Sequence, residues 1–229
     1  MVIKWMVVNT SILERKEKEK EQRRNAIVEA AQSLFFSKPY DEITIEAVAE
    51  KAQLAKGTVY LYFKSKEELY LAVALRGERI LNLMFKRAIG GNKNGLEKAF
   101  ATGEAYYEFY KLHAQYFRMC LEAENMLVLN TDNVCAKELI ETSYENLQIV
   151  HDSVVEGIKD GSIKSDLDSM LTSIFLIQST RGMIQLPPCF ETFLTQSGAD
   201  KDATAKFTLD ALRLALQNIQ TKTARGGAK

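Results

Sequence analysis

The sequence predicts an all-α protein, and two observations support this prediction. Only 3 Pro and 12 Gly occur among 229 residues, so few positions interrupt a helix. Apolar residues recur at spacings of three and four along most of the chain, and no stretch of useful length alternates as a half-buried strand does. Because 46% of the residues are hydrophobic, the chain has enough apolar material for a core between packed helices.

Residues 1–15 are expected to be a disordered leader, unless translation starts later, at Met6. The start of this leader is apolar but short, and Lys4 interrupts it, unlike a signal peptide. A run of alternating charge over 14–22 then begins the first helix, because opposite charges four residues apart stabilise a helix. Pro39 prevents this helix from continuing. Its buried face consists of Ile27, Ala30, Ala31, Leu34 and Phe35.

Two short helices joined by a tight turn follow, over 44–52 and 57–63. Thr44 caps the helix over 44–52, and Leu54 fills the turn. This helix buries Ile45, Val48 and Ala49. In the second helix we attribute the apolar residues to packing alone: Val59, Leu61 and Phe63. This is the pattern of a helix-turn-helix, whose second helix enters the major groove of DNA.

A fourth helix is predicted over 65–89, with a capping box at Ser65-Lys-Glu-Glu68 and a weak point at Gly77. Residues 90–95 are the clearest linker in the chain. Beyond it, apolar periodicity predicts further helices over 96–113, 115–123, 134–159, 166–186 and 199–221. The breaks that separate the later helices are 130–133, 160–162, Pro187-Pro188 and 197–198.

Several separated motifs within residues 24–70 resemble the N-terminal domain of the TetR family of transcriptional regulators. They are I-V-E-A-A-Q-S-L-F at 27–35, Y-D-E-I-T-I at 40–45, V-A-E-K-A at 48–52, K-G-T-V-Y-L-Y-F at 56–63 and K-S-K-E-E-L at 64–69. The resemblance implies a three-helix DNA-binding domain with a helix-turn-helix over 16–66. It also implies a larger helical domain for effector binding and dimerisation over 67–229, with helix 65–89 linking the two.

Eight residues are predicted to contact operator DNA: Thr44, Lys56, Gly57, Thr58, Tyr60, Tyr62, Lys64 and Lys66. Gly57 allows close backbone approach, and Thr58 can touch a base edge or a thymine methyl. The resemblance implies backbone and base contacts for the two tyrosines and phosphate contacts for the lysines. Capping alone also explains Thr44, and one of the two tyrosines can belong to the core. Arg23 and Arg24 either reach a minor groove or solvate a helix start, and the second interpretation is favoured.

Seven aromatic residues lie between Leu96 and Met119, and such density can line an effector pocket. The resemblance places effectors among the middle helices of the C-terminal domain. We assign to this site Tyr106, Tyr110, Phe117, Phe175, Gln178 and Arg181. For any single aromatic residue, core packing is the competing interpretation. Arg181 stands in an apolar helix, so it lies at the surface or pairs with an acid or with an anionic group of a ligand.

The last two predicted helices, 166–186 and 199–221, carry apolar faces. These faces include Ile174, Ile177, Met183, Phe207, Ala211, Leu214 and Ile219. The resemblance implies that the two helices pair with their copies in the four-helix bundle of a homodimer. A twofold dimer sets two recognition helices about 34–36 Å apart, and the operator is then palindromic.

The formal net charge is zero, but the charge is unevenly spread. Residues 1–66 hold 12 Lys plus Arg against 9 Asp plus Glu, whereas the remainder holds 18 against 21. A basic N-terminal segment suits a protein that binds DNA phosphates through its N-terminal domain. Three widely separated cysteines favour a reducing cytoplasm, and no window is apolar enough to span a membrane. No metal cluster, phosphate loop or catalytic cluster is visible, so we expect no enzyme, cofactor or metal.

These observations predict a TetR-like regulator of cytoplasmic location. It represses transcription by binding operator DNA as a homodimer, and a small-molecule effector releases it by tilting helix 65–89. The alternative is a DNA-bound structural or partner-binding protein of the same fold without an effector.

Overall fold

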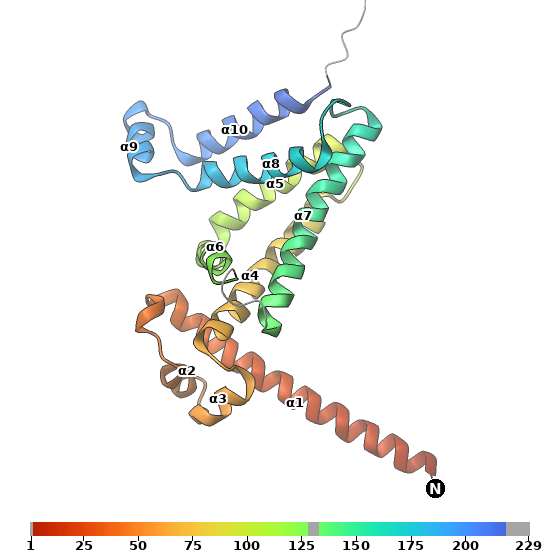
Figure 1. Ribbon diagram of the computed structural model, residues 1–229, viewed down its shortest axis with the longest axis vertical. Helices are drawn as coiled ribbons and strands as arrows, with labels where there is room; N and C mark the ends of the chain where they lie inside the picture. The colour runs from red at the N-terminus through yellow and green to blue at the C-terminus, as the bar shows by residue number, and fades with distance from the viewer. Residues whose placement is uncertain (1, 128–132, 219–229) are drawn as a thin grey trace, which may run out of the picture. The chain divides into compact units, whose positions relative to one another are not determined.

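The computed structural model describes residues 2–127 and 133–218, which form ten α-helices and one short 3-10 helix (Figure 1). In chain order they are α1 (Val2–Ser37), η1 (Tyr40–Glu42), α2 (Ile45–Lys51), α3 (Lys56–Tyr62), α4 (Lys66–Ala88), α5 (Gly95–Leu112), α6 (Ala114–Leu127), α7 (Val134–Asp160), α8 (Ser169–Ile184), α9 (Pro188–Ser197) and α10 (Lys201–Leu216). The extended pairing seen in these residues is an isolated bridge between Ile163 and Gln217. The predicted all-α fold class is therefore confirmed.

Helix α1 begins at Val2, which differs from the prediction of a disordered leader over 1–15: residues 2–15 are helical, and Met1 lies outside the described residues. The physical reason is that no glycine or proline precedes Pro39, so nothing in the sequence interrupts the helix towards its N-terminus. The predicted four-residue charge pairs also form, since Arg15 Nε lies 2.9 Å from Glu19 Oε1.

Helix α9 corrects the sequence-based prediction, which treats Pro187-Pro188 as a break. Pro188 is instead the first residue of α9, where a missing backbone N–H is harmless. Gly198 ends α9 in the left-handed conformation, with φ 77°. The two helices predicted to pair in a dimer are thus α8 and α10, with α9 between them in the chain. The second of them ends at Leu216, and Ile219 lies outside the described residues.

The chain folds into two compact units. Unit 1 contains the chain up to Glu78 together with Gln115–Glu141, and unit 2 contains Arg79–Ala114 and the chain from Thr142 onward. This division differs from the predicted domain boundary between 66 and 67. The reason is that the first half of α4 and parts of α6 and α7 pack into the core of unit 1.

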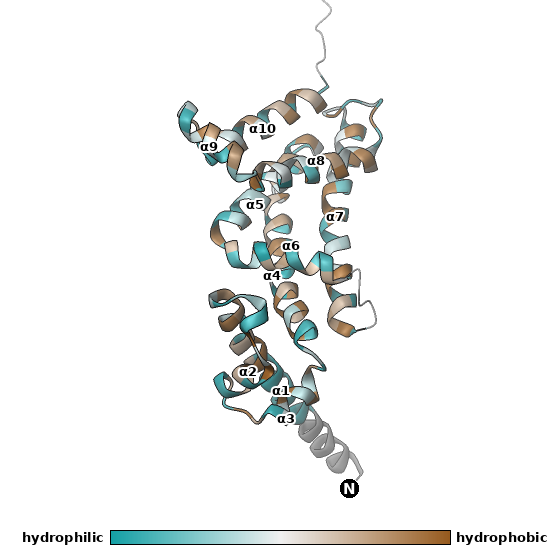
Figure 2. Cartoon of the chain, turned by 60° about the vertical axis from the view of Figure 1, so that its left-hand side comes forward, coloured by the Kyte–Doolittle hydropathy of each residue, from teal (hydrophilic) through white to brown (hydrophobic). Residues whose placement is uncertain are grey.

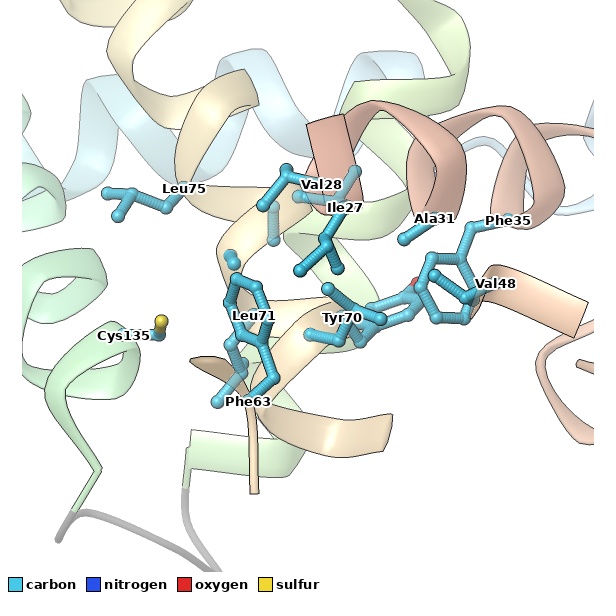
Figure 3. Packing of buried hydrophobic residues seen from close by; sticks show 14 of the residues in the cluster. Ile27, Val28, Ala31, Phe35, Val48, Phe63, Tyr70, Leu71, Leu75 and Cys135 are labelled. Carbon is cyan, nitrogen blue, oxygen red and sulfur yellow. The ribbon is translucent and has the colours of Figure 1, made fainter. Parts of the chain in front are cut away.

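A hydrophobic cluster forms the core of unit 1 (Figure 3). Figure 3 shows side chains of α1, including Ile27 and Phe35, pointing towards Phe63 and towards Tyr70 and Leu71 of α4. Helix α4 is enclosed on all sides here, because every residue from Leu69 to Leu75 is at most 3% exposed. The helix-turn-helix is therefore packed on a dense scaffold that resists deformation.

Gly77 marks a close crossing between α4 and α6 in unit 1. A Cβ at this position would lie 2.9 Å from Cys120 Sγ and 3.0 Å from Tyr116 Cβ. The first distance is shorter than real Cβ atoms show and the second is tighter than most Cβ contacts, so the glycine permits the two helices to approach. The residue predicted as a weak point of the helix is instead required by packing.

The core of unit 2 lies among α5, α7, α8 and α10 and includes Phe100, Val154, Leu176 and Leu212. Helix α8 packs against α5 and α10 (Figure 1). Helices α5 and α7 cross so closely that a Cβ on Gly95 would lie 1.9 Å from the Gly157 nitrogen. Hydrophilic and hydrophobic residues alternate along the helices in Figure 2, as expected for helices that bury one face.

Candidate nucleic-acid interface

Helices α2 and α3 form the predicted helix-turn-helix in unit 1. The hydroxyl of Thr44 accepts a hydrogen bond from the Ala47 N–H at 3.2 Å, which confirms the predicted cap of α2. Gln53 turns the chain with φ 57°, a left-handed conformation that is unfavourable for a residue with a Cβ. The Leu54 N–H then donates to the Ala49 carbonyl at 2.9 Å and closes the turn.

Helix α3 has one buried and one exposed face. Val59 and Phe63 are both 0% exposed, whereas Tyr60 is 40% and Leu61 77% exposed. The attribution of Leu61 to packing is therefore wrong. Successive helical residues are about 100° apart, so Leu61 lies roughly 200° from Val59 and points away from the core. That rotation shows from the sequence that Val59 and Leu61 cannot share a face, although it does not tell which of the two is buried.

The remaining uncharged candidates on α3 divide between its two faces. Gly57 is exposed, and a Cβ built there would meet no described atom beyond its local backbone within 4 Å. Thr58 is half-buried. Tyr62 is also half-buried and packs against the core cluster of unit 1, so the core interpretation fits it better than Tyr60. Gly57 and Tyr60 are the accessible pair.

Lys56 begins α3 and forms an exposed ion pair with Glu46 of α2. The hydrogen bond between them raises the pKa of Lys56 and lowers the pKa of Glu46. The Lys56 ammonium also lies 5.7 Å from the ring centroid of Tyr60. Lys56 therefore stays charged beside the exposed face, and a DNA phosphate would compete with Glu46 for it.

The two lysines after α3 differ in their surroundings. Lys64 is exposed, and its ammonium donates to the Tyr60 carbonyl at 3.4 Å. Lys66 is half-buried, donates to the Tyr40 carbonyl at 3.0 Å and lies 4.0 Å from the Tyr40 ring centroid. Lys66 thus fastens the start of α4 to η1, whereas Lys64 stands beside the exposed face of α3.

The predicted capping box before α4 is only half present. The Ser65 hydroxyl accepts from the Glu68 N–H at 3.2 Å, as predicted. The Glu68 carboxylate accepts from the Lys64 N–H at 2.6 Å, one residue before the position that a capping box uses. Farther upstream, the Arg24 guanidinium lies 5.2 Å from the Phe63 ring centroid and donates to Cys135 Sγ at 3.5 Å, while Arg23 is exposed.

The six residues predicted to bind an effector occupy different environments. Phe117 is buried on α6 in unit 1, whereas the other five belong to unit 2. Phe175 and Gln178 are exposed on α8. Tyr106 and Tyr110 are half-buried on α5, and the Tyr110 hydroxyl accepts from Lys201 at 3.4 Å. Arg181 is half-buried and donates through Nε to Gln185 at 3.1 Å. The six do not share one lining.

Unit 2 contains a pocket of about 510 Å³ between the second half of α4 and α5. Among the residues that the structure describes, those that line the pocket are Ile80, Leu83, Met84, Arg87, Ala88, Ala105, Glu108, Leu112 and His113. None of the six predicted effector residues is among them. Aromatic density in the sequence points to other residues, whereas this pocket is lined mainly by aliphatic side chains together with Arg87, Glu108 and His113. The spacing of Ile80, Met84 and Arg87 places them on one face of α4, but it does not show that α5 leaves a cavity beside this face.

Helices α8, α9 and α10 expose large apolar side chains. On α8 and α10 these are Met170, Leu171, Ile174, Phe175, Phe207 and Leu214. Helix α9 adds Phe190 and Phe193, and none of its residues is buried. Met183, by contrast, is buried within unit 2. The predicted apolar faces of α8 and α10 are thus partly core and partly surface.

Two classes of site are not seen in the described part of the chain. Among these residues no helix combines the length and the apolar character needed to cross a bilayer. Within the same residues no three His, Cys, Asp or Glu side chains are grouped so as to hold a metal ion.

A comparison with protein families matches residues 27–73 to the family described as bacterial regulatory proteins of the TetR family. The match contains α2 and α3 whole, together with the end of α1 and the start of α4. All eight predicted DNA contacts lie inside it. The match and the exposed face of α3 thus concern the same segment.

Two relatives and one solved structure are similar over longer stretches. The transcriptional activator FasR of Mycolicibacterium smegmatis is 28% identical over 103 residues, 45% of this chain and 47% of FasR, so the match spans less than half of that relative. The transcriptional repressor KstR2 of the same organism is 26% identical over 160 residues, 69% of this chain and 76% of KstR2. The structure of FadR from Bacillus subtilis in complex with stearoyl-CoA has a TM-score of 0.61 and 20% identity, covering 82% of this chain and 96% of FadR.

Proposed function

The chain belongs to the TetR family of bacterial regulatory proteins, and from this premise we propose that it is a homodimeric repressor that a small molecule releases from its operator. Regulators of this family are not enzymes. The observation that carries the proposal is the exposed face of α3, where Gly57, Tyr60 and Leu61 stand clear of the core. A helix that presents one open face on a rigid scaffold suits insertion into a major groove. The place of action is then the cytoplasm, on double-stranded DNA.

The phosphate contacts of this proposal come from groups around α3. Thr44 at the start of α2 is exposed, as are Lys56 and Lys64 at the two ends of α3. Such contacts fix the position of the protein on the duplex without reading sequence. Each lysine that meets a phosphate releases a counterion, so operator affinity falls with salt. Lys66 is a weaker candidate because its ammonium is already held by Tyr40.

The homodimer of this proposal pairs the exposed apolar faces of α8 and α10 with their copies. These two helices pack against each other within unit 2 and leave Phe175 and Phe207 in solvent. Large exposed apolar surfaces on a soluble chain mark sites of association. Twofold symmetry would give the dimer two α3 helices, one for each half of a palindromic operator.

The effector site of this proposal is the pocket between α4 and α5. Ile80, Leu83 and Met84 offer apolar contact, and Arg87 offers a positive charge in the same lining. Such a lining suits an amphipathic molecule with a hydrocarbon part and an anionic group. Stearoyl-CoA, the ligand in the structure of FadR, has this character. Helix α4 runs without interruption from this pocket into unit 1, so a ligand that favours another position of α4 would change DNA affinity.

A thermal-unfolding assay tests the effector part of the proposal. Stearoyl-CoA is added to the purified protein, and free stearate serves as the comparison for the thioester. We expect the melting temperature to rise and operator affinity to fall together, and the variant Arg87→Gln to lose most of both effects. The rival function, a partner-binding protein without an effector, is favoured if neither probe changes either quantity.

The direction of regulation needs a separate test, because the relatives include the activator FasR and the repressor KstR2. We propose repression. A reporter gene downstream of the selected operator should then be expressed weakly with the protein and strongly without it. Higher expression in the presence of the protein would assign it to activators instead.

DNA binding itself is tested with fragments selected from a random pool by the full chain. We expect a palindromic consensus, and the double variant Lys56→Ala with Tyr60→Ala should lose retardation of that fragment. Both side chains are exposed, so the variant should keep its melting temperature and its dimeric mass. Retardation that survives unchanged would show that α3 does not read the operator.

A further inference from the structure

The most exposed large side chain on α3 is apolar. Leu61 is 77% exposed, while Val59 two residues earlier on the same helix is 0% exposed. The side chain of Leu61 therefore does not contribute to the core of unit 1. The exposure of one leucine alone indicates no partner, but Leu61 stands on the second helix of the helix-turn-helix, which the proposed function inserts into a major groove.

Gly57 lies one helical turn before Leu61 and therefore on the same outward face. No described atom lies within 4 Å of a Cβ built on Gly57, apart from its local backbone. The outermost line of α3 thus consists of an open backbone followed by a branched aliphatic side chain. Polar groups stand to the side of this line, on Tyr60 and on Lys56.

The floor of the major groove contains one apolar group, the C5-methyl of thymine. Leucine can donate and accept no hydrogen bond, so it cannot recognise the polar edges of guanine, adenine or cytosine. Placing it against such an edge would remove a polar group from water without a partner. The thymine methyl is therefore the feature of B-DNA that matches Leu61.

The geometry points to Leu61 as a specificity residue that reads a thymine methyl in each operator half-site, with Gly57 letting the backbone come close enough for the contact. This inference rests on the proposed DNA-binding function and deepens it. It assigns to Leu61 a role distinct from Thr58, which is half-buried, and from the lysines, which meet phosphates. The operator then carries an invariant thymine at the contacted position of each half-site.

The test uses the selected operator with single thymines replaced by deoxyuridine, which lacks only the methyl. Substitution at one symmetric pair of positions should weaken binding of the wild-type dimer roughly fifteenfold, or about fourfold for each methyl. For Leu61→Ala the same DNA change should alter operator affinity by no more than about twofold, because the side chain that contacts the methyl is gone. Leu61→Met keeps an apolar side chain of similar size and should keep the discrimination.

Two further measurements distinguish a failure of the inference about Leu61 from a failure of the proposed DNA-binding function. Because Leu61 is exposed, Leu61→Ala should keep the melting temperature of the wild type, so a loss of binding cannot be ascribed to unfolding. If Leu61→Ala discriminates thymine from deoxyuridine as strongly as the wild type at every position, the inference is overturned while the proposed function stands. If the wild-type chain selects no DNA at all, the proposed function fails, and the inference fails with it.

Discussion

Helix α3 in unit 1 and helices α8 and α10 in unit 2 both leave apolar side chains in solvent, but in different settings. On α3 a single leucine, Leu61, is exposed beside Tyr60 and next to an open glycine. On α8 and α10 the exposed residues are several and bulky, among them Phe175 and Phe207. The surface of α3 at Gly57, Tyr60 and Leu61 is therefore narrow, and the surface of α8 and α10 around Phe175 and Phe207 is extended.

The difference teaches how exposed apolar groups indicate the kind of partner. A narrow line with Lys56 and Lys64 at its ends suits a charged duplex that offers isolated methyl groups. An extended set of aromatic and aliphatic side chains suits another protein surface of the same kind, where area and shape carry the binding. The two surfaces should therefore fail independently when they are mutated.

The largest effect is expected from a charge placed on the extended surface. Phe207→Glu introduces a carboxylate where the proposed dimer buries an aromatic ring. A central interface aromatic contributes about 2 kcal/mol or more, and twofold symmetry applies the loss twice, so the dimer dissociation constant should rise roughly a thousandfold. Sedimentation of the variant at micromolar concentration should show monomers.

The matched control for this change is Tyr144→Glu. Tyr144 of α7 is as exposed as the residues of the proposed dimer surface but lies outside α8 and α10. It should leave the dimer intact. A dimer that tolerates Phe207→Glu, or that breaks with Tyr144→Glu, would place the interface elsewhere and remove the contrast with α3.

A smaller effect is expected on the narrow surface from Gly57→Ala. The added methyl meets open space in the free protein, and alanine favours helix, so stability should stay equal or rise by up to about 1 kcal/mol. The same methyl would stand between the backbone and the duplex, so operator affinity should fall at least about tenfold. Titration by fluorescence anisotropy measures the affinity, and thermal unfolding measures the stability.

If Gly57→Ala binds the operator with the affinity of the wild type, the backbone of α3 does not approach DNA closely. The dimer supplies a further check, because Gly57→Ala should not change the dissociation constant that Phe207→Glu changes. The two variants together decide whether the surfaces act independently.

Most helices follow from the sequence, because apolar periodicity and capping residues are local signals. Thr44 and the glycine-rich linker at 90–95 mark boundaries that the structure confirms to within a residue or two. Helix α9 does not follow, because Pro187-Pro188 is compatible with both a break and the first turn of a helix. None of its residues is fully buried within the described chain, and only Glu191 and Leu194 are half-buried, so apolar periodicity directed at a core is a weak signal there.

The candidate site follows only in part, since periodicity tells which residues share a face but not which face is buried. In the short helix α3, Val59 and Leu61 are both apolar, and only one of them packs. Lys66 has the composition of a phosphate contact, yet a carbonyl 26 residues upstream in the chain holds its ammonium. The pocket of unit 2 depends on how α4 and α5 are spaced, which no local pattern encodes.

A moderate effect on stability alone is expected from Gln53→Gly. Gln53 has φ 57°, and glycine adopts this left-handed conformation without a clash of its Cβ. Stability of the folded chain should rise by about 1 kcal/mol, as judged by urea unfolding, while Gln53→Val should lower it. The substitution lies in the turn, so neither the narrow nor the extended surface loses a group. A change in dimer dissociation with either variant would contradict the independence of the two surfaces.

The smallest effect is expected from Glu46→Gln, which removes the acid that pairs with Lys56 in the free protein. A phosphate must now compete with no carboxylate for that ammonium, so operator affinity should rise about twofold at low salt. The gain should vanish near 1 M salt, where screening suppresses exposed charge pairs. Glu50→Gln removes the same charge from another exposed position on α2 and is the matched control. If both variants gain equally, the gain reflects net charge alone, and Lys56 is not a phosphate contact at the edge of the narrow surface.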